Sequence, residues 1–204
     1  MPALLSLSRL IDSISLLLGK FVMWLILAAT AISAGNAIMR KAFSVGSNAY
    51  LEIQWYLFAA VFMLGVGYVM LNNAHVRIDF ISTRLSKRTN AIIDAIGIVV
   101  FTIPLALIMV DLGWPVFYRA LQSGEMSQNA GGLIRWPVFM LIPLGFSLLI
   151  MQSASELIKR IAFLTGHCPE PFTIEHDKTA EELLLEELAR EAEARLSSLP
   201  ARAN

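Results

Sequence analysis

The ionisable residues with the clearest spacing lie in one short segment, residues 71–90, LNNAHVRIDFISTRLSKRTN. This bridge joins an uncharged apolar run to a second, largely apolar run, and its six ionisable residues are His75, Arg77, Asp79, Arg84, Lys87 and Arg88. One imidazole without a second ligand in view does not predict a metal site. Clustered cations suit phosphate headgroups, and an acid among them suits a helix start or an ion pair. The bridge therefore predicts binding to lipid or protein.

The spacing within the bridge predicts a short amphipathic helix. Apolar residues recur at i, i+3 and i+7, namely Ile78, Ile81 and Leu85. Arginines recur on a different face at i, i+7 and i+11, namely Arg77, Arg84 and Arg88. In one interpretation the cations anchor on anionic lipid, each contributing about 1 kcal/mol. In the other, Asp79 holds Arg77, His75 or a cation of another chain.

The rest of the chain offers no catalytic or metal-binding pattern. Cys168 is the only cysteine, which excludes an intrachain disulfide and a site with several cysteine ligands. Its surroundings, GHCPEPFTIEH, lack a recognised ligand spacing. The formal net charge is zero, so no overall field attracts nucleic acid. We therefore expect neither an enzyme nor a cofactor.

The composition predicts an all-α membrane protein. Hydrophobic residues make up 56% of the 204 residues, charged residues make up only 16%, and the apolar ones are clustered. A helix needs about 20 apolar residues to cross a bilayer. Four stretches meet this length, at about 21–39, 53–74, 91–110 and 136–157. The expected membrane domain is 21–166, with proline-induced bends at Pro104 and Pro143.

Two flanking segments are expected outside the spans. Apolar residues at helical spacing in 1–20 predict an amphipathic helix in the membrane interface. Residues 167–204 predict a cytoplasmic linker followed by an amphipathic helix that is rich in Glu and Arg.

Basic residues predict the orientation, since they are enriched in cytoplasmic segments. One side of the predicted topology carries Arg9, Lys20, Arg77, Arg84, Lys87, Arg88, Lys159 and Arg160. The other side carries only Arg40, Lys41, Arg119 and Arg135. Both termini are therefore expected in the cytoplasm.

The predicted spans contain almost no ionisable groups at mid-membrane depth. Glu52 and Asp111 are expected at the outer edge, and Asp94 and Glu156 at the inner edge. Gln152 is expected to make a hydrogen bond between helices. Small residues, at Gly65 and Gly67 and at Ala31 and Gly35, predict close approach of helices. A dry, apolar centre favours a scaffold over a transport path.

Several segments resemble the small membrane subunit (DctQ-like) of tripartite ATP-independent periplasmic (TRAP) transporters. NAHVRIDFISTRLSKR resembles the family's bridge, with its His-x-x-x-Asp element at His75 and Asp79. YLEIQWYLFAAVFMLGVGY resembles the family's second span, with Glu52 at its start and Trp55 a turn on. SQNAGGLIRWP and IPLGFSLLIMQSASELIKRIAFLTG resemble the fourth-span region. The resemblance covers about residues 10–166.

The resemblance implies a scaffold function in the bacterial inner membrane. Such a subunit braces a large multi-span subunit that carries the substrate and sodium sites, while a periplasmic substrate-binding protein delivers an organic acid. The branch suggests 2-oxo acids, lactate or aromatic acids. Alternatives from the residues alone are a self-assembling small transporter or channel and a membrane anchor for a redox enzyme.

Three groups of residues follow as candidate sites. The partner or structural lock comprises Glu52, Trp55, His75, Arg77 and Asp79. Contact with lipid headgroups is expected from Arg84, Lys87 and Arg88. Docking of the binding protein is expected on the loop from Gly113 to Arg135, through Arg119, Glu125 and Arg135.

Overall fold

The computed structural model describes residues 2–44, 46–73, 85–167 and 190. The chain divides into two units, Met1–Pro171 and Phe172–Asn204. In the second unit only Arg190 is described, so the predicted helix of the C-terminal tail lies almost entirely outside the described residues. Four residues of the bridge also lie outside them, namely His75, Arg77, Asp79 and Arg84.

The first unit is built from long helices in the ranges that the structure describes. They are α1 (Pro2–Phe43), α2 (Asn48–Leu71), α4 (Lys87–Gly97), the π-helical turn η1 (Ile98–Thr102), α5 (Ile103–Ser123) and α6 (Trp136–Leu164). The all-helical prediction is confirmed, and four helical runs are long and apolar enough to span a membrane.

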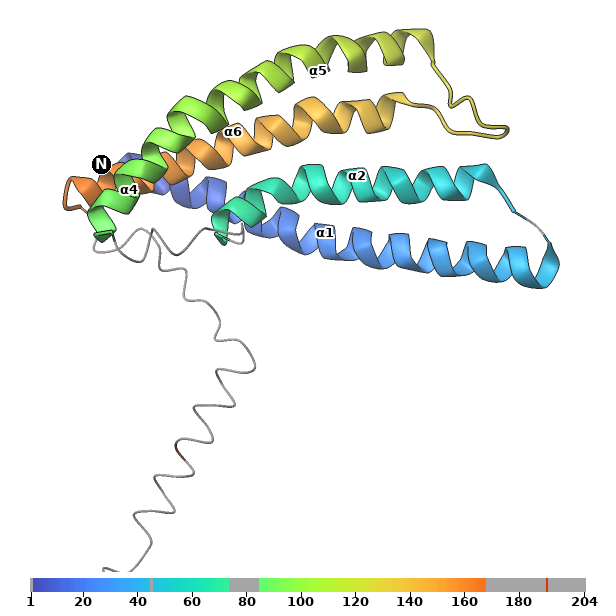
Figure 1. The fold of residues 1–204 in the computed structure, drawn as a ribbon, viewed down its shortest axis with the longest axis horizontal. Coiled ribbons are helices and arrows are strands. Elements are labelled where there is room, and N and C mark those ends of the chain that lie inside the picture. The colour runs from blue at the N-terminus through green and yellow to red at the C-terminus, as the bar shows by residue number, and fades with distance from the viewer. Residues whose placement is uncertain (1, 45, 74–84, 168–189, 191–204) are drawn as a thin grey trace, which may run out of the picture. The chain divides into compact units, whose positions relative to one another are not determined.

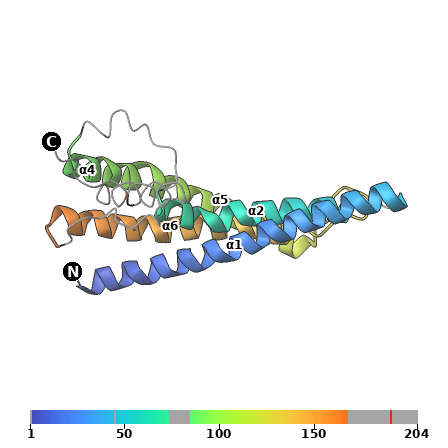
Figure 2. The ribbon, with the colours of Figure 1, turned by 90° about the horizontal axis from the view of Figure 1, so that it is seen from below.

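Helix α6 is the centre of this unit. It contacts α5 and α4 on one side and α2 and α1 on the other, while α1 and α2 pack on each other. Figures 1 and 2 show this order, with connections 44–47 and 124–135 at one end. We call this the loop end, and the opposite end, where α1 begins and α6 ends, the N-terminal end.

The first helix contains both the expected interfacial segment and the first span without a break. Its buried residues form one stripe at helical spacing, comprising Ser8, Ile11, Ser15, Gly19, Val22 and Ala29. Because this stripe crosses the expected boundary near residue 20, the two segments pack as one element. The expected apolar face is largely turned outward, with Leu4 47% and Leu7 48% exposed. The location of residues 1–20 at the membrane surface stays a prediction.

The other helix ends also differ from the expected spans. The second helix ends at Leu71, with Asn72 as its C-cap, rather than at residue 74. The third helical run extends from Lys87 to Ser123, well beyond 91–110, and α6 continues to Leu164. Hydropathy locates the apolar centre of a helix, but polar turns continue the same hydrogen-bonding pattern beyond it.

The third run changes its helical pitch once, in η1. Its buried residues are Ala91, Ile98, Ala106, Gly113 and Ala120. The spacing is seven residues throughout, except for the eight residues between Ile98 and Ala106. A π turn takes up one residue more than an α turn, and here the N–H of Ile103 bonds the carbonyl of Ile98. The extra residue, next to Pro104, keeps the small side chains facing α6.

Glycine allows the helices of the bundle to approach closely. A Cβ at Gly145 would lie 2.8 Å from both the Cβ and the carbonyl oxygen of Met63 on α2. A Cβ at Gly67 would lie 3.0 Å from the Oγ of Ser15, which confirms the close packing predicted there. Gly35 differs, because nothing in the described part of the chain lies within 4 Å of its ideal Cβ.

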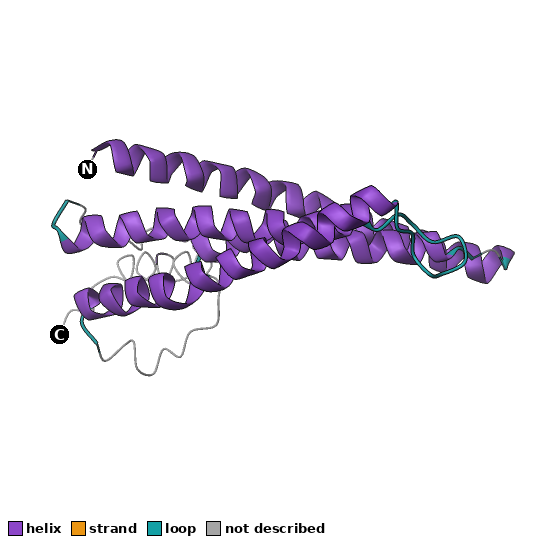
Figure 3. Ribbon diagram, turned by 90° about the horizontal axis from the view of Figure 1, so that it is seen from above, coloured by secondary structure: helices purple, strands orange, loops and turns teal. Residues whose placement is uncertain are grey.

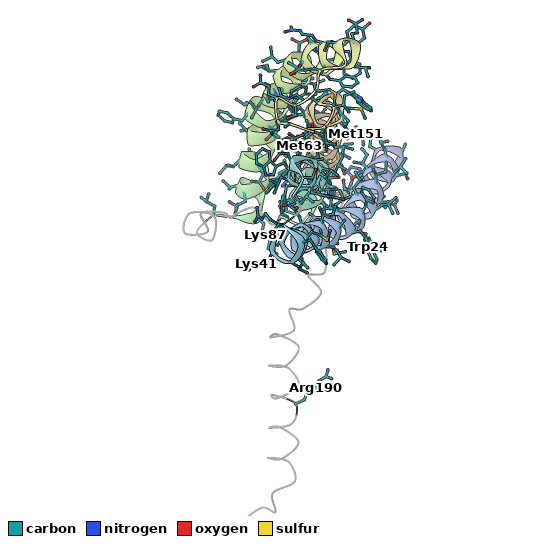
Figure 4. All side chains as sticks on the ribbon, turned by 90° about the vertical axis from the view of Figure 1, so that its right-hand side faces the viewer. Trp24, Lys41, Met63, Lys87, Met151 and Arg190 are labelled. Carbon is teal, nitrogen blue, oxygen red and sulfur yellow. The ribbon has the colours of Figure 1, made fainter. Side chains whose placement is uncertain are left out.

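The outer faces of the helices are apolar. Trp24 is 70% exposed and points away from the bundle (Figure 4), and Phe62 is 73% exposed. Side chains of this kind are stable on the surface of a bundle when lipid or another apolar subunit covers them.

Candidate functional site

Polar side chains gather at both ends of the bundle. At the loop end the centre is Glu52, in the first turns of α2, which is 4% exposed. Its carboxyl accepts hydrogen bonds from the Asn129 side chain (2.7 Å), from the Leu133 backbone N–H (2.6 Å) and from the Ser127 hydroxyl. These four residues, the Glu52 cluster, tie the 124–135 connection to α2.

The connection itself folds back on this anchor. The N–H of Ser127 donates to the carbonyl of Leu133 (2.8 Å), and the N–H of Arg135 donates to the carbonyl of Glu125 (2.9 Å). Gly131, with φ of 71°, turns the chain between these two strands of backbone. Figure 3 shows this connection as a loop between helices. Its backbone bonds give the loop a defined shape without regular secondary structure.

Two more side chains hold the loop on the helices. The hydroxyl of Tyr56 donates to the carbonyl of Ile134 (3.1 Å), and the amide of Asn48 donates to the carbonyl of Ala130 (3.1 Å). A cavity of about 320 Å³ remains beside the Glu52 cluster, lined by Glu52, Trp55, Tyr56, Ser127, Asn129, Arg135, Val138 and Phe139. The loop end is therefore a shaped polar surface resting on aromatic side chains.

At the N-terminal end, α1 and α6 meet through polar side chains. Ser15 donates to the Oε1 of Gln152 (2.7 Å), and the Nε2 of Gln152 donates to Asp12 (3.0 Å). Ser155 also donates to Asp12 (2.8 Å), and its hydroxyl lies 2.7 Å from that of Ser8. Gln152 and Ser155 are fully buried, so their hydrogen bonds replace bonds to water. The predicted interhelical bond of Gln152 is confirmed.

Charged residues continue this contact towards α4. Lys159 pairs with Asp12 (3.1 Å) and with Glu156, and Arg160 pairs with Glu156 and with Asp94 (3.3 Å). Glu156 and Arg160 are both 3% exposed. Buried charges of this kind require partners, and removal of one partner costs about 3–5 kcal/mol. We call these residues, together with Ser8, Ser15, Gln152 and Ser155, the inner network.

The chemistry of both clusters is that of hydrogen bonding and ion pairing. Their carboxyl groups accept bonds from hydroxyl, amide, ammonium or guanidinium groups of the same chain. Within the described ranges, no group of three or more His, Cys, Asp or Glu residues could hold a metal ion. The clusters fix helices and a loop relative to one another, and the span centres between them are apolar.

The predicted site residues are only partly brought together. Glu52 and Arg135 line one cavity with Trp55, while Arg135 pairs with Glu125 at 2.9 Å. Arg119 is exposed on α5, apart from this pair. Arg88 donates to the carbonyl of Leu164 (3.4 Å), and Lys87 is exposed beside it at the start of α4. The other four bridge residues lie outside the described part of the chain.

Most of the inner network was not predicted from the sequence. Its signal was present in the spacing, with Ser8, Asp12 and Ser15 at i, i+4 and i+7 and with Gln152, Glu156 and Arg160 at steps of four. Each set occupies one helix face. In a membrane protein a polar face turns towards the protein, so two such faces predict a contact.

Four long apolar helices, with a network of ion pairs at the N-terminal end and the hydrogen-bonded Glu52 at the loop end, define a multi-pass membrane protein. Residues 29–163 match the model of the family described as "Tripartite ATP-independent periplasmic transporters, DctQ component". The chain belongs to this family, whose members function in tripartite complexes with a large membrane subunit and a periplasmic binding protein. It is thus a small permease subunit of a TRAP transporter. Comparisons with curated proteins and with solved structures give no match.

Proposed function

We propose that this subunit braces the large membrane subunit during sodium-coupled uptake of an organic acid delivered by a periplasmic binding protein. A brace must keep its shape while its partner moves. It must also present an apolar surface to that partner within the membrane.

The observation that carries this proposal is that Glu52 and the ionic groups of the inner network bond within this chain. The inner network links α1, α6 and α4, and the Glu52 cluster links α2 to the loop before α6. Large side chains cover the outer faces, such as Phe101 (72% exposed) and Trp55 (68% exposed). Transport sites instead require polar groups converging at mid-membrane depth.

We place the N-terminal end in the cytoplasm, because more basic residues flank the spans there. A reporter fused after Gln128 is then expected in the periplasm, and one fused after Gly166 in the cytoplasm. The opposite pattern would reverse the orientation and would move the loop end away from the binding protein.

The loop end supports a second part of the proposal, docking of the binding protein. Its exposed charges include Arg119 and the pair of Glu125 with Arg135. Charge reversal at Arg119 and Glu125 should weaken docking, and more so at low salt, since salt screens exposed charges. Uptake that is unchanged across concentrations of binding protein would remove these residues from the interface. The cations Arg84, Lys87 and Arg88 are proposed to contact lipid headgroups on the other side.

Reconstitution into liposomes tests the function. This chain alone should not move organic acids, whereas the chain with the large subunit, the binding protein and a sodium gradient should. The 2-oxo acids, lactate and aromatic acids are the first substrates to test. Uptake by the purified chain alone would support a self-assembling transporter, and haem or quinone bound to the purified chain would support a redox anchor.

A further inference from the structure

Asp111, predicted at the outer edge of a span, lies well inside the helix α5. Helix α5 continues to Ser123, about 18 Å along the axis beyond Asp111. The nearby Gly113 packs on α6, where a Cβ would be 3.2 Å from the Cδ of Pro143. Pro143 is itself about 10 Å along α6 from its first residue, Trp136. With a membrane boundary near Trp136, the first residue of α6, the carboxyl group of Asp111 would be at membrane depth.

Aromatic rings lie between Asp111 and the loop end. Trp114 and Phe117 lie edge to face at 5.7 Å, and Phe117 and Trp136 lie 6.5 Å apart. Tryptophan is enriched where a helix leaves the hydrocarbon core. Asp111 precedes Trp114 by about 4.5 Å along the helix, on the side of the membrane centre.

The direction of the side chain increases this depth. In an α-helix each Cα–Cβ bond tilts towards the helix N-terminus. For Asp111 this direction leads away from Trp114 and further into the membrane. Its single methylene group moves the carboxylate only a short way from the helix axis, unlike the long side chain of the exposed Lys20 on α1.

Asp111 also faces outward. It is exposed, and it lies roughly 160° around the helix from Gly113, which faces α6. Its exposed neighbours on the same face are apolar, with Ile108 56% and Trp114 59% exposed. Among the described residues, none forms a hydrogen bond or an ion pair with the Asp111 carboxyl. Ionisable groups at such depth normally pair with another group.

A second hydrogen-bond acceptor lies at the same position. Pro115 is inside α5, four residues after Asp111. Proline has no N–H, so it cannot donate the regular helical bond to the carbonyl of Asp111. Pro115 is exposed on the same face as the carboxyl. This face of α5 thus has a carboxylate and a backbone carbonyl that lacks its regular helical donor.

We propose that Asp111 and its carbonyl form a docking point for an arginine or lysine on a membrane helix of the large subunit. The proposal rests on the proposed function, which supplies that partner. Arginine fits best, because its planar group donates several bonds at once. A second copy of this chain fits poorly, because Lys20 lies towards the N-terminal end and Arg40 and Lys41 end α1 at the loop end.

Co-purification with the large subunit tests the proposal. The two membrane subunits are expressed together, a tag on this chain captures the complex in mild detergent, and dilution gives the apparent Kd. Asp111→Leu should weaken the complex at least tenfold, as loss of a charge-assisted bond in an apolar setting implies. Asp111→Asn, which keeps one acceptor, should weaken it less. Lys20→Met is a control that removes another exposed charge. Its apparent Kd should stay within about twofold of the wild-type value.

Two further measurements separate the explanations. The melting temperature of the isolated Asp111→Leu chain should equal or exceed that of the wild-type chain, because an apolar residue replaces a charge on an apolar face. Replacing the matching basic residue of the large subunit should weaken the complex equally, without further loss in the double variant. Any of three results would overturn the docking point. The Asp111→Leu chain could bind the large subunit as tightly as the wild-type chain does, the isolated variant could melt at a lower temperature, or the substitution could affect self-association alone. If the wild-type chain does not capture the large subunit, the proposed function is wrong, and this inference is wrong with it.

Discussion

The carboxyl of Glu52 lies 2.6 Å from the backbone nitrogen of Leu133, although 81 residues separate the two in the sequence. This bond joins the start of α2 to the loop that precedes α6. It makes Glu52 a structural acceptor within its own chain. From the sequence, Glu52 is a candidate for holding this chain either to itself or to a partner. The observed contacts favour a bond within this chain. The exposed Trp55 beside it is still available to a partner.

Glu52→Gln should loosen the 124–135 connection. Its amide keeps the shape of the side chain, but only one of its two polar atoms can accept a hydrogen bond. A buried donor left without an acceptor costs about 1–3 kcal/mol. We expect a lower melting temperature in detergent and faster proteolysis within the loop. Glu125→Gln, which breaks the exposed pair with Arg135, should cost less than about 1 kcal/mol. Equal effects of the two variants would contradict the role of Glu52.

Asp12→Ala should detach the first half of α1 from α6. Asp12 accepts bonds from Gln152 and Ser155 and pairs with Lys159, so its loss removes one acceptor from each of three donors. The expected cost is about 1–3 kcal/mol, measured as thermal unfolding in detergent. Ser13→Ala is the matched control, because Ser13 is exposed and donates only to the carbonyl of Arg9 in its own helix. If both variants unfold alike, the inner network does not hold α1.

Gly145→Ala should separate α2 from α6. Its new Cβ would lie 2.8 Å from the backbone oxygen of Met63, which cannot move without shifting α2. Overpacking of this kind costs about 1–3 kcal/mol. Gly97→Ala is the control, since nothing lies within 4 Å of its ideal Cβ and alanine favours a helix by up to about 1 kcal/mol. Melting temperatures of the two variants should therefore change in opposite directions.

The bridge can be tested by a pair of variants. If Asp79 locks the bridge to this chain or to its partner, Asp79→Asn should reduce co-purification of the large subunit more than tenfold, as loss of about 1.5–3 kcal/mol implies. Arg88→Gln should do much less, and His75→Ala should fall between. A silent Asp79→Asn, with a severe effect of removing Arg84, Lys87 and Arg88 together, would instead identify the bridge as a lipid anchor.

The sequence by itself determined the four helical spans and their approximate centres. Long runs without charge can satisfy their backbone hydrogen bonds within a membrane only as helices, and this constraint is local. It also indicated Glu52, an acid at the start of an apolar run, and the hydrogen bond of Gln152 between helices. These residues stand out because a polar group beside hydrocarbon needs a partner.

The tertiary structure alone decided which groups are those partners. Glu52 could have met a second protein as well as Leu133, and nothing local to α2 distinguishes the two. The polar face of residues 8–15 resembles the water-facing side of an interfacial helix. In the structure this face instead contacts α6, where Gln152 and Ser155 bond to it. Periodicity defines a helix face, but only packing decides what the face meets.

The extent and phase of the third helix were likewise decided in three dimensions. Hydropathy ended the span near residue 110, whereas the helix continues to Ser123 and carries Asp111 within it. The π turn at Ile98–Thr102 adds the one residue that keeps Ala91 and Ala106 on the same side. Pro104 beside the turn is a local signal for a bend, but only packing on α6 decides which positions the turn brings into line.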